Sequence, residues 1–387
     1  MIERKYIHFS KDVKFINSAI QQFENIAEGE SVFYALMDSE EDEIKNINTN
    51  ESVIKITKIE LSELINRIDI SSIVFFHSLF PDVYPFILAL DRKIKIVWFC
   101  FGFEVYNDNY FFDDKFSLGS ITYSLYARKS ISKREYFSTF IRSKLRFLFR
   151  NLSMSTYEQK KQVFKRINLI GSPFREEFEK IKKIINFGGN YFEFSYYPIE
   201  LIISQNDINK NNKCKILVGN SGFYTSNHLE VFETLRNNDL SKYQVVVPLN
   251  YGKKAYIDFL TKKGFEYFGA DKFNPLLESM SIDDYNELLN EVEFAFLNNR
   301  RQQAVGNTIA LIYLGANVIL NEENPMYKFL RRIGVIVHKF NEDFDLNKLK
   351  KLTDSELDLN RMKLMNYFGK VTLEKSLSEQ LNQIKSF

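Results

Sequence analysis

Three polar loops in the second half of the sequence carry residue types that bind phosphates and sugars. The first loop follows an apolar run at residues 214–218 and leads into a helix expected from His228 onwards. Glycines let the backbone approach a phosphate closely, serine hydroxyls donate hydrogen bonds, and a helix N-terminus adds free N–H groups. An ordinary helix cap uses the same residue types, so that alternative stays open for this loop. Its candidate donor- and phosphate-binding residues are Gly219, Asn220, Ser221, Gly222 and His228.

The second loop follows an apolar run at residues 293–297 and opens an apolar helix expected over residues 309–314. Arg301 offers a guanidinium fork that suits a diphosphate, and the residues after it present another helix terminus. A surface loop that merely caps its helix is the alternative. The candidate phosphate-binding residues of this loop are Arg301, Gln302, Gln303, Gly306, Asn307 and Thr308.

The third loop, residues 320–325, again lies at the end of an apolar run. A carboxylate at such a place can accept hydrogen bonds from the hydroxyls of a ribose or another sugar. The candidate sugar-binding residues are Asn321, Glu323 and Asn324. Asn324 followed by Pro325 is also a common helix start, and the two roles are compatible.

In the first half of the sequence, His77 and Glu104 come directly after apolar runs. A residue of either type at a strand end can act as the general base that deprotonates an acceptor hydroxyl. We therefore take both as candidate catalytic residues. The alternatives are a hydrogen-bonded, half-buried histidine at position 77 and a solvated loop residue at position 104.

The elements that must position these residues alternate between strands and helices, which indicates βαβ units. We predict strands at residues 31–37, 53–56, 72–76, 95–101, 214–218, 243–248, 265–268, 292–297 and 317–320, and helices at 228–237 and 282–290. A chain of 387 residues exceeds the size of a single core. The sequence therefore predicts an α/β protein with two Rossmann-like domains facing a cleft, in which ligands bind at the carboxyl ends of strands.

The polar stretch at residues 204–213 has the composition of an interdomain linker. We therefore expect an N-terminal domain at residues 1–203 and a C-terminal domain at residues 214–373. A last helix within residues 374–387 could pack back onto the first domain. That last point stays open in the sequence.

The segment at residues 122–166 contains twelve Lys or Arg against two Glu, although the net charge of the chain is only +2. Its apolar side chains recur every three or four residues, so we predict an amphipathic helical region that meets an anionic membrane or a lipid-linked substrate. A solvated face over the domain core is the alternative. Nucleic acid is not expected as a partner, because no known nucleic-acid module is visible. The residues proposed for this surface are Arg142, Lys144, Arg146 and Arg150.

Several classes of protein are excluded by composition. Hydrophobic residues make up 45% and charged residues 26% of the chain, as in soluble globular proteins. The two cysteines, Cys100 and Cys214, lie far apart without a neighbouring histidine, so neither a disulfide framework nor a metal-ligand spacing is present. The first residues lack the apolar stretch of a secretion signal, and no run of about eighteen apolar residues occurs. We expect a protein of the reducing cytoplasm.

In the second half, the ordered motifs resemble those of the TDP-N-acetylfucosamine:lipid II N-acetylfucosaminyltransferases, glycosyltransferase family 56. The residues that carry the resemblance are Gly219 to Gly222, His228, Pro248, Tyr251, Tyr256, Glu278, Asp283, Tyr285, Arg301 to Gln303, Gly306, Asn321 and Glu323 to Pro325. The likeness in the first half is thinner, and Glu104 stands where the family more often has Asp. Ala304 and Asn307 also depart from the family, which expects a glycine and a hydroxyl residue there.

The resemblance implies a GT-B glycosyltransferase that works without a metal or other cofactor. It also implies that residues 1–203 form the acceptor domain and residues 214–373 the nucleotide-sugar domain. Its donor would be 4-acetamido-4,6-dideoxygalactose linked to TDP, and its acceptor a saccharide on a polyprenyl diphosphate. The implied location is the cytoplasmic face of the bacterial inner membrane, as a peripheral protein. Two other functions fit the sequence, a catalytically silent GT-B protein that binds carbohydrate or lipid, and an epimerase of the same architecture.

Overall fold

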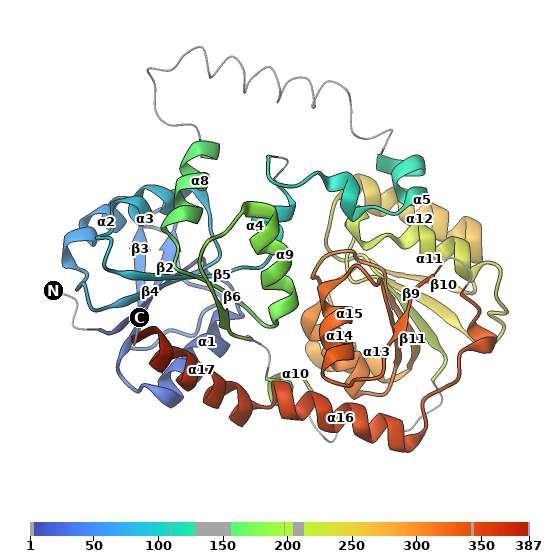
Figure 1. Ribbon diagram of the computed structural model, residues 1–387. Coiled ribbons are helices and arrows are strands. Elements are labelled where there is room, and N and C mark those ends of the chain that lie inside the picture. Colours follow the sequence, from blue (N-terminus) through green and yellow to red (C-terminus); the bar gives the residue numbers. More distant parts are fainter. Residues whose placement is uncertain are drawn as a thin grey trace, which may run out of the picture. The chain divides into compact units, whose positions relative to one another are not determined.

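The computed structural model describes residues 4–108, 110–127, 156–196, 198–203, 213–341 and 344–385. The described residues form two units, each built around one parallel sheet (Figure 1). Unit 1 takes its residues from Met1–Phe112, Arg146–Pro198 and Lys370–Phe387, and unit 2 from Asp113–Leu145 and Ile199–Gly369. Within the described ranges no helix is both long and apolar enough to span a bilayer.

Unit 1 contains a sheet in the order β3-β2-β1-β4-β5-β6-β7, and every neighbouring pair is parallel. Its strands are β1 (Tyr6–Ser10), β2 (Ser31–Met37), β3 (Val53–Thr57), β4 (Ile73–His77), β5 (Lys95–Phe99), β6 (Leu169–Ser172) and β7 (Asn190–Glu193). Its helices are α1 (Ile16–Ile26), α2 (Lys58–Glu63), α3 (Tyr84–Ala89), α4 (Phe103–Tyr106), α8 (Thr156–Arg166), α9 (Arg175–Ile185) and α17 (Lys370–Lys385).

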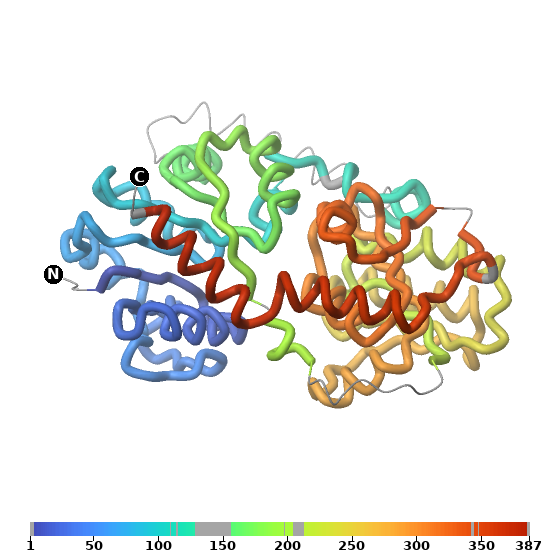
Figure 2. Tube along the Cα trace, turned by 60° about the horizontal axis from the view of Figure 1, so that its bottom comes forward, coloured from blue at the N-terminus to red at the C-terminus, as the bar shows by residue number. Residues whose placement is uncertain are grey.

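Both faces of this sheet are covered by helices, which explains why its strands read as continuous apolar runs. All residues of β2 and β4 are buried. Along β1, Tyr6 joins the core beneath α1 and α17, whereas Ile7 and Phe9 join the core beneath α3, α8 and α9. Figure 2 shows α17, at the red end of the chain, alongside α1. The last helix is therefore part of unit 1.

Unit 2 contains a second parallel sheet, in the order β10-β9-β8-β11-β12-β13. Its strands are β8 (Lys215–Val218), β9 (Gln244–Pro248), β10 (Phe273–Leu276), β11 (Val292–Leu297), β12 (Asn317–Leu320) and β13 (His338–Lys339). Its helices are α5 (Ser120–Thr122), α10 (Ile199–Ile202), α11 (His228–Leu235), α12 (Lys254–Phe268), α13 (Ile282–Asn290), α14 (Val305–Tyr313), α15 (Pro325–Arg332) and α16 (Asp354–Phe368). The short helical turns η3 (Asp114–Ser117), η4 (Tyr123–Ala127) and η6 (Tyr224–Ser226) also belong to this unit.

In each unit the strand order reverses beside the first strand, between β1 and β4 in unit 1 and between β8 and β11 in unit 2. Such a reversal leaves a crevice at the carboxyl ends of the strands, where ligands bind in doubly wound folds. The prediction of two Rossmann-like domains is confirmed.

One predicted strand is wrong. Residues 265–268 form the last turn of α12, and Gly269, with φ of 74°, ends the helix. Phe265 and Phe268 lie three residues apart on one helix face, and both rings pack against Phe273 of β10, at centroid distances of 5.2 and 6.2 Å. The aromatic run that looked like a strand is therefore the end of a helix whose Phe265 and Phe268 rings contact Phe273.

The division of the chain also differs from the predicted domains. Residues 113–127, expected within an N-terminal domain of residues 1–203, pack in unit 2. Thr122 shows why, because its backbone N–H and its hydroxyl both donate to the carboxylate of Glu230 on α11. Residues 204–212 of the predicted linker lie outside the described residues.

Candidate functional site

The three polar loops identified in the sequence follow β8, β11 and β12, which are neighbours in the sheet of unit 2. Because all three strands run in the same direction, the loops meet at one edge, the carboxyl edge of the sheet. We refer to them as the β8 loop (residues 219–227), the β11 loop (298–304) and the β12 loop (321–324). Each leads into a helix, α11, α14 or α15.

The glycines of the β8 loop allow close packing inside the loop. Gly219 has φ of 70°, and a Cβ atom there would lie only 2.4 Å from Nε2 of His228. Gly222 donates its N–H to Tyr251 O at 2.7 Å, and a Cβ on it would lie 2.3 Å from Cγ1 of Ile257. No other residue type fits either position without displacement of its neighbours. The glycines thus hold the loop against α11 and α12.

The polar side chains of the β8 loop are almost wholly buried. Asn220 donates from Nδ2 to the hydroxyl of Tyr251 at 3.2 Å, while its Oδ1 has no hydrogen-bond partner among the described residues. The same holds for the hydroxyl of Ser221. Buried polar groups are nearly always hydrogen-bonded, so atoms of this kind indicate that a ligand or water completes the loop.

His228, the first residue of α11, is also buried. Its Nδ1 lies 3.1 Å from the hydroxyl of Tyr256, and its Nε2 has no hydrogen-bond partner among the described residues. Burial lowers the pKa of His228 to about 3, so the imidazole is neutral at physiological pH. A neutral ring can offer a hydrogen bond from one nitrogen without carrying a charge.

In the β11 loop, Arg301 and Gln302 are 7% and 9% exposed. Gln302 Oε1 has no partner within the described chain, whereas Gln303 Oε1 accepts from the Asn299 amide and lies 3.4 Å from the Thr225 hydroxyl. The β8 and β11 loops are therefore in direct contact. Ala304 has φ of 55°, a left-handed conformation that explains why glycine would suit this position better.

The first turn of α14 contains the other three residues predicted in this loop. Asn307 donates from Nδ2 to the hydroxyl of Tyr285 at 3.2 Å. Thr308 donates its hydroxyl to Ala304 O at 2.8 Å and so secures the helix start. Gly306 is half-buried beside them. Helix α14 thus begins directly after the loop that carries Arg301.

The β12 loop is joined to the β11 loop by two asparagines. Asn321 donates from Nδ2 to Oδ1 of Asn298 at 2.9 Å, and Asn324 donates to Asn299 O at 3.0 Å. Asn324 also caps α15, because its Oδ1 accepts from the N–H of Met326, so both roles considered for it coexist. Glu323 is exposed and lies 3.8 Å from Arg300.

Sequence reasoning missed three asparagines that hold these loops together. Asn227 donates from Nδ2 to Asn298 O at 3.0 Å, and Asn299 donates to the hydroxyl of Ser226 at 3.4 Å. Asn299 also keeps a buried Oδ1 without a partner among the described residues. The signal was present in the sequence as a pair of asparagines directly after an apolar run, the position at which a buried polar side chain can bridge two strand ends.

The two candidate catalytic residues of unit 1, His77 and Glu104, are buried in the structure. His77 is 1% exposed, with Nε2 3.1 Å from Nδ1 of His8 and Nδ1 2.5 Å from the hydroxyl of Tyr196. Burial lowers the pKa of His77 to about 3. The structure thus favours the alternative of a hydrogen-bonded histidine that packs in the aromatic core.

Glu104 is neither an exposed base nor a solvated loop residue, because it is only 4% exposed in the first turn of α4. Its carboxylate accepts from Nε1 of Trp98 at 3.3 Å and from the N–H of Phe101 at 3.5 Å. Burial raises the pKa of this carboxyl group. We therefore do not assign Glu104 as the base for an acceptor hydroxyl, because its carboxylate already accepts these hydrogen bonds.

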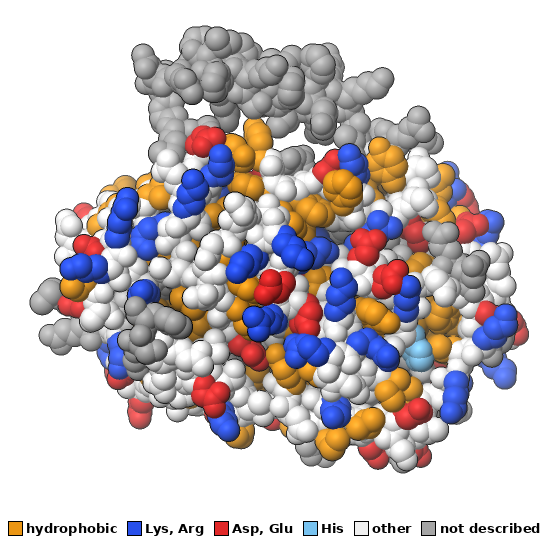
Figure 3. All heavy atoms as spheres, in the orientation of Figure 1, with side chains coloured by type: hydrophobic (Ala, Val, Ile, Leu, Met, Phe, Trp, Pro, Cys, Tyr) orange, Lys and Arg blue, Asp and Glu red, His pale blue; other side chains and the backbone are white. Residues whose placement is uncertain are grey.

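The basic surface predicted from Arg142, Lys144, Arg146 and Arg150 lies outside the described residues. Over the described residues, Figure 3 shows that basic and acidic side chains are interspersed on the face in view.

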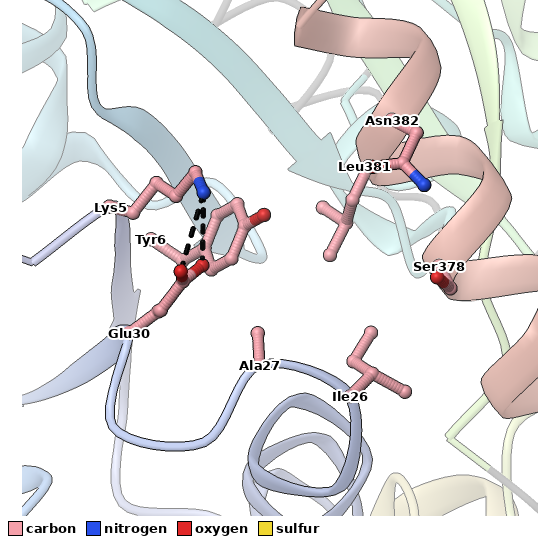
Figure 4. A pocket seen from close by; sticks show the side chains of 8 residues that line it. All are labelled: Lys5, Tyr6, Ile26, Ala27, Glu30, Ser378, Leu381 and Asn382. Carbon is pink, nitrogen blue, oxygen red and sulfur yellow. Dashed lines mark hydrogen bonds and ion pairs between the residues drawn. The ribbon is translucent and has the colours of Figure 1, made fainter.

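A small pocket of about 190 Å³ lies in unit 1 at the amino-terminal end of β1 (Figure 4). It is lined by Lys5, Tyr6, Ile26, Ala27, Glu30, Ser378, Leu381 and Asn382. Lys5 and Glu30 point toward one another and form an ion pair at 3.2 Å. The pocket lies at the opposite edge of its sheet from His77, and its charged groups already neutralise each other, so we assign it no role in the reaction.

Comparison with solved structures finds the same architecture in several known proteins. The α,α-trehalose 6-phosphate synthase of Burkholderia multivorans matches with a TM-score of 0.60 at 9% identity, over 100% of this chain and 99% of that chain. The Candida albicans trehalose-6-phosphate phosphatase N-terminal domain matches with 0.64 at 10% identity, over 100% and 97%. Anabaena HepE, solved with UDP and glucose, matches with 0.60 at 10% identity, over 98% and 100%. The fold is therefore GT-B.

The family comparison covers half of the chain and includes the three loops. Residues 182–376 match the family described as 4-alpha-L-fucosyltransferase, glycosyl transferase group 56. This match confirms the resemblance that the loop residues carry. The chain therefore belongs to the 4-alpha-L-fucosyltransferase family, glycosyl transferase group 56, and is a glycosyltransferase.

Proposed function

We propose that the carboxyl edge of unit 2 binds a nucleotide sugar as the glycosyl donor. The observation that carries this proposal is a group of buried polar atoms in two contacting loops and at the start of α11. These atoms have no hydrogen-bond partner among the described residues. They are Asn220 Oδ1, Ser221 Oγ, His228 Nε2, Asn299 Oδ1 and Gln302 Oε1. Leaving one such atom unsatisfied costs about 1–3 kcal/mol, so a ligand that pairs with them gains affinity.

The chemistry of these atoms fits both parts of a nucleotide sugar. Amide oxygens, as on Asn299 and Gln302, accept hydrogen bonds from sugar hydroxyls or from the N–H of an acetamido group. The Ser221 hydroxyl and the guanidinium of Arg301 donate to phosphate oxygens. The helices that begin at the same edge, α11 and α14, add positive dipole ends.

In the proposed reaction, the bond between the anomeric carbon of the sugar and the diphosphate breaks as an acceptor hydroxyl oxygen bonds to that carbon. The proton of the hydroxyl passes to solvent water, and the nucleoside diphosphate leaves with the bonding electrons. We propose that Arg301 and the helix N-termini stabilise the charge on the departing diphosphate without a metal ion or other cofactor.

For the substrates, the resemblance leads us to propose 4-acetamido-4,6-dideoxygalactose on TDP as donor and a saccharide on a polyprenyl diphosphate as acceptor. Unit 1 would bind the acceptor. Asn321, Asn324 and Glu323, in the β12 loop, are proposed to contact the ribose or the sugar.

The experiment that tests the donor site is calorimetry with TDP, UDP, GDP and CMP. We expect TDP to bind most tightly. If none of the four nucleotides binds, the proposal is refuted.

A turnover assay then separates an enzyme from a silent binding protein. Incubation with the TDP sugar and a lipid-linked acceptor should release free TDP, whereas a silent protein would bind and release none. Conversion of the donor without an acceptor would indicate an epimerase.

We further propose that the basic segment at residues 122–166 holds the protein at the cytoplasmic face of the bacterial inner membrane, where a lipid-linked acceptor resides. Electrostatic binding weakens as salt screens the charges. Sedimentation with vesicles that contain anionic lipid should therefore retain the protein at low salt and release it at high salt. Retention that does not depend on salt would contradict this role.

A further inference from the structure

Residues 113–127, which we call the strap, belong to unit 2 and contact α11 and α12. Figure 1 shows α5, the central part of the strap, beside α11. Tyr126 packs edge-on against Tyr256, with ring centroids 4.8 Å apart, and lies 5.3 Å from the ring of Phe259. These ring contacts fasten the strap to α12, the helix that follows β9.

A buried carboxylate makes this attachment specific. Glu230, on the first turn of α11, accepts from the N–H of Thr122 at 2.8 Å and from its hydroxyl at 2.5 Å. Both residues are buried, and Gly119 passes so close that a Cβ on it would lie 2.1 Å from the carboxylate. The buried charge holds the strap in one position, because moving the strap would leave the carboxylate without these donors.

Asn227 connects the strap to the donor site. Its Oδ1 accepts from the N–H of Gly119 at 2.9 Å, and its Nδ2 donates to Ser117 O at 2.9 Å and to Asn298 O at 3.0 Å. The residue is fully buried with φ of 52°, a conformation that asparagine tolerates better than most residues. One amide group thus joins the strap, the start of α11 and the β11 loop.

The connection extends across the carboxyl edge of the sheet. Asn298, held by Asn227 through its backbone, accepts the amide of Asn321 through its side chain. Its neighbour Asn299 carries one of the unsatisfied atoms proposed to meet the donor. A satisfied buried network of this kind favours a single arrangement of the groups it connects.

We propose that Asn227 is a positioning residue for the donor site, and that the strap is the anchor that fixes its orientation. This inference rests on the proposed donor site, since it assigns a role to a residue that need not touch the ligand. Without the strap, two of the three hydrogen bonds of the Asn227 side chain are lost, and the amide that orients the β11 loop can rotate away. Donor affinity then depends on a segment more than one hundred residues distant in the sequence.

The test replaces Asn227 with glycine, which keeps the left-handed backbone and removes the amide. Asn186→Gly is the matched control, because Asn186 also has a left-handed backbone, with φ of 50°, at the end of α9 in unit 1. We expect Asn227→Gly to weaken TDP binding about tenfold, and Asn186→Gly to leave it within about twofold. Equal affinities for the two variants would overturn the proposal.

A second pair of variants tests two separate points. The first asks whether the hydrogen bonds of the Asn227 side chain matter or only its shape, and the second asks whether the strap contributes to donor affinity. Asn227→Asp keeps the shape but cannot donate to Ser117 O or Asn298 O, so we expect it to bind TDP more weakly than Asn227→Gly. Gly119→Ala leaves the side chain at position 227 as asparagine, but its new methyl group would force the strap away from Glu230. Wild-type affinity in Gly119→Ala would overturn the anchoring role of the strap.

Two further measurements show whether Asn227 positions the donor site or only stabilises the fold. One of them can be made even if the proposed donor site binds no nucleotide. In turnover, Asn227→Gly should raise the KM for the donor more than it lowers kcat. Hydrogen exchange needs no nucleotide, and the amides of residues 298–303 should exchange about tenfold faster in Asn227→Gly, while amides of the central strands β8 and β11 remain protected. Unchanged exchange in this loop would contradict the inference even if no nucleotide bound to the wild-type protein.

Discussion

Replacing Gly219 with alanine is expected to lower the free energy of unfolding by roughly 2–5 kcal/mol and to abolish measurable TDP binding. Two costs add at this position. The backbone φ of 70° is strained for any residue with a side chain, and the new methyl group would lie 2.4 Å from Nε2 of His228, which is itself buried and cannot move aside. Denaturant unfolding and calorimetry measure the two effects.

Two other glycines separate these costs. Gly269 has φ of 74° with open space around it, so Gly269→Ala should show the backbone cost alone, about 1–2 kcal/mol. Gly188 has neither a positive φ nor a neighbour within 4 Å, and Gly188→Ala should be nearly neutral. The double variant Gly219→Ala with His228→Ala should recover part of the loss, because it removes the ring that the methyl group meets. A Gly219→Ala variant no less stable than Gly269→Ala would show that the contact with His228 is unimportant.

Much of the fold could be predicted because strands buried on both faces leave long apolar runs. Residues 31–37 and 292–297 coincide with β2 and β11. The failure at residues 265–268 arose because a short aromatic run satisfies both a strand and one face of a helix, and only tertiary packing against Phe273 decides between them.

The position of the strap could not be predicted, because it depends on contacts between residues far apart in the chain. Thr122 was placed in a basic surface segment, whereas its hydrogen bonds to Glu230 bury it in unit 2. No local pattern marks Glu230 as a buried carboxylate, since an acidic residue in the first turn of a helix is ordinarily solvated and favoured by the helix dipole.

The meeting of the three polar loops was predictable in outline, because the carboxyl edge of a parallel sheet collects the loops that follow its strands. The hydrogen bonds that join Asn298 to Asn321, and Asn299 to Asn324, bring the second and third motifs together. The candidate base was not predictable in the same way. His77 and Glu104 also follow strands, but whether a side chain at a strand end faces ligand or core depends on its neighbours, and here His8, Tyr196 and Trp98 enclose them.

Arg301 gives the second large expected effect. Arg301→Ala should weaken TDP binding by at least about 1.5 kcal/mol, the lower value for a hydrogen bond to a charged group, which corresponds to more than a tenfold rise in Kd. The adjacent Arg300 is the matched control, because it carries the same charge and forms a partly exposed ion pair with Glu323 at 3.8 Å. The two side chains are 29% and 55% exposed, and such a pair contributes little. We therefore expect Arg300→Ala to change the affinity for TDP by less than about twofold.

Arg301→Lys then tests whether charge or geometry matters. Lysine keeps the positive charge but lacks the planar fork that binds two phosphate oxygens at once, so an intermediate affinity for TDP is expected. Because Arg301 is only 7% exposed, thermal unfolding of each variant must show that the fold persists at the temperature of titration. If Arg301 stabilises the leaving diphosphate, its replacement should lower kcat by a larger factor than it lowers the affinity for TDP. The reason is that the negative charge on the diphosphate grows as the sugar departs. Equal losses in kcat/KM and in TDP affinity, with kcat unchanged, would instead make Arg301 a ground-state binding residue.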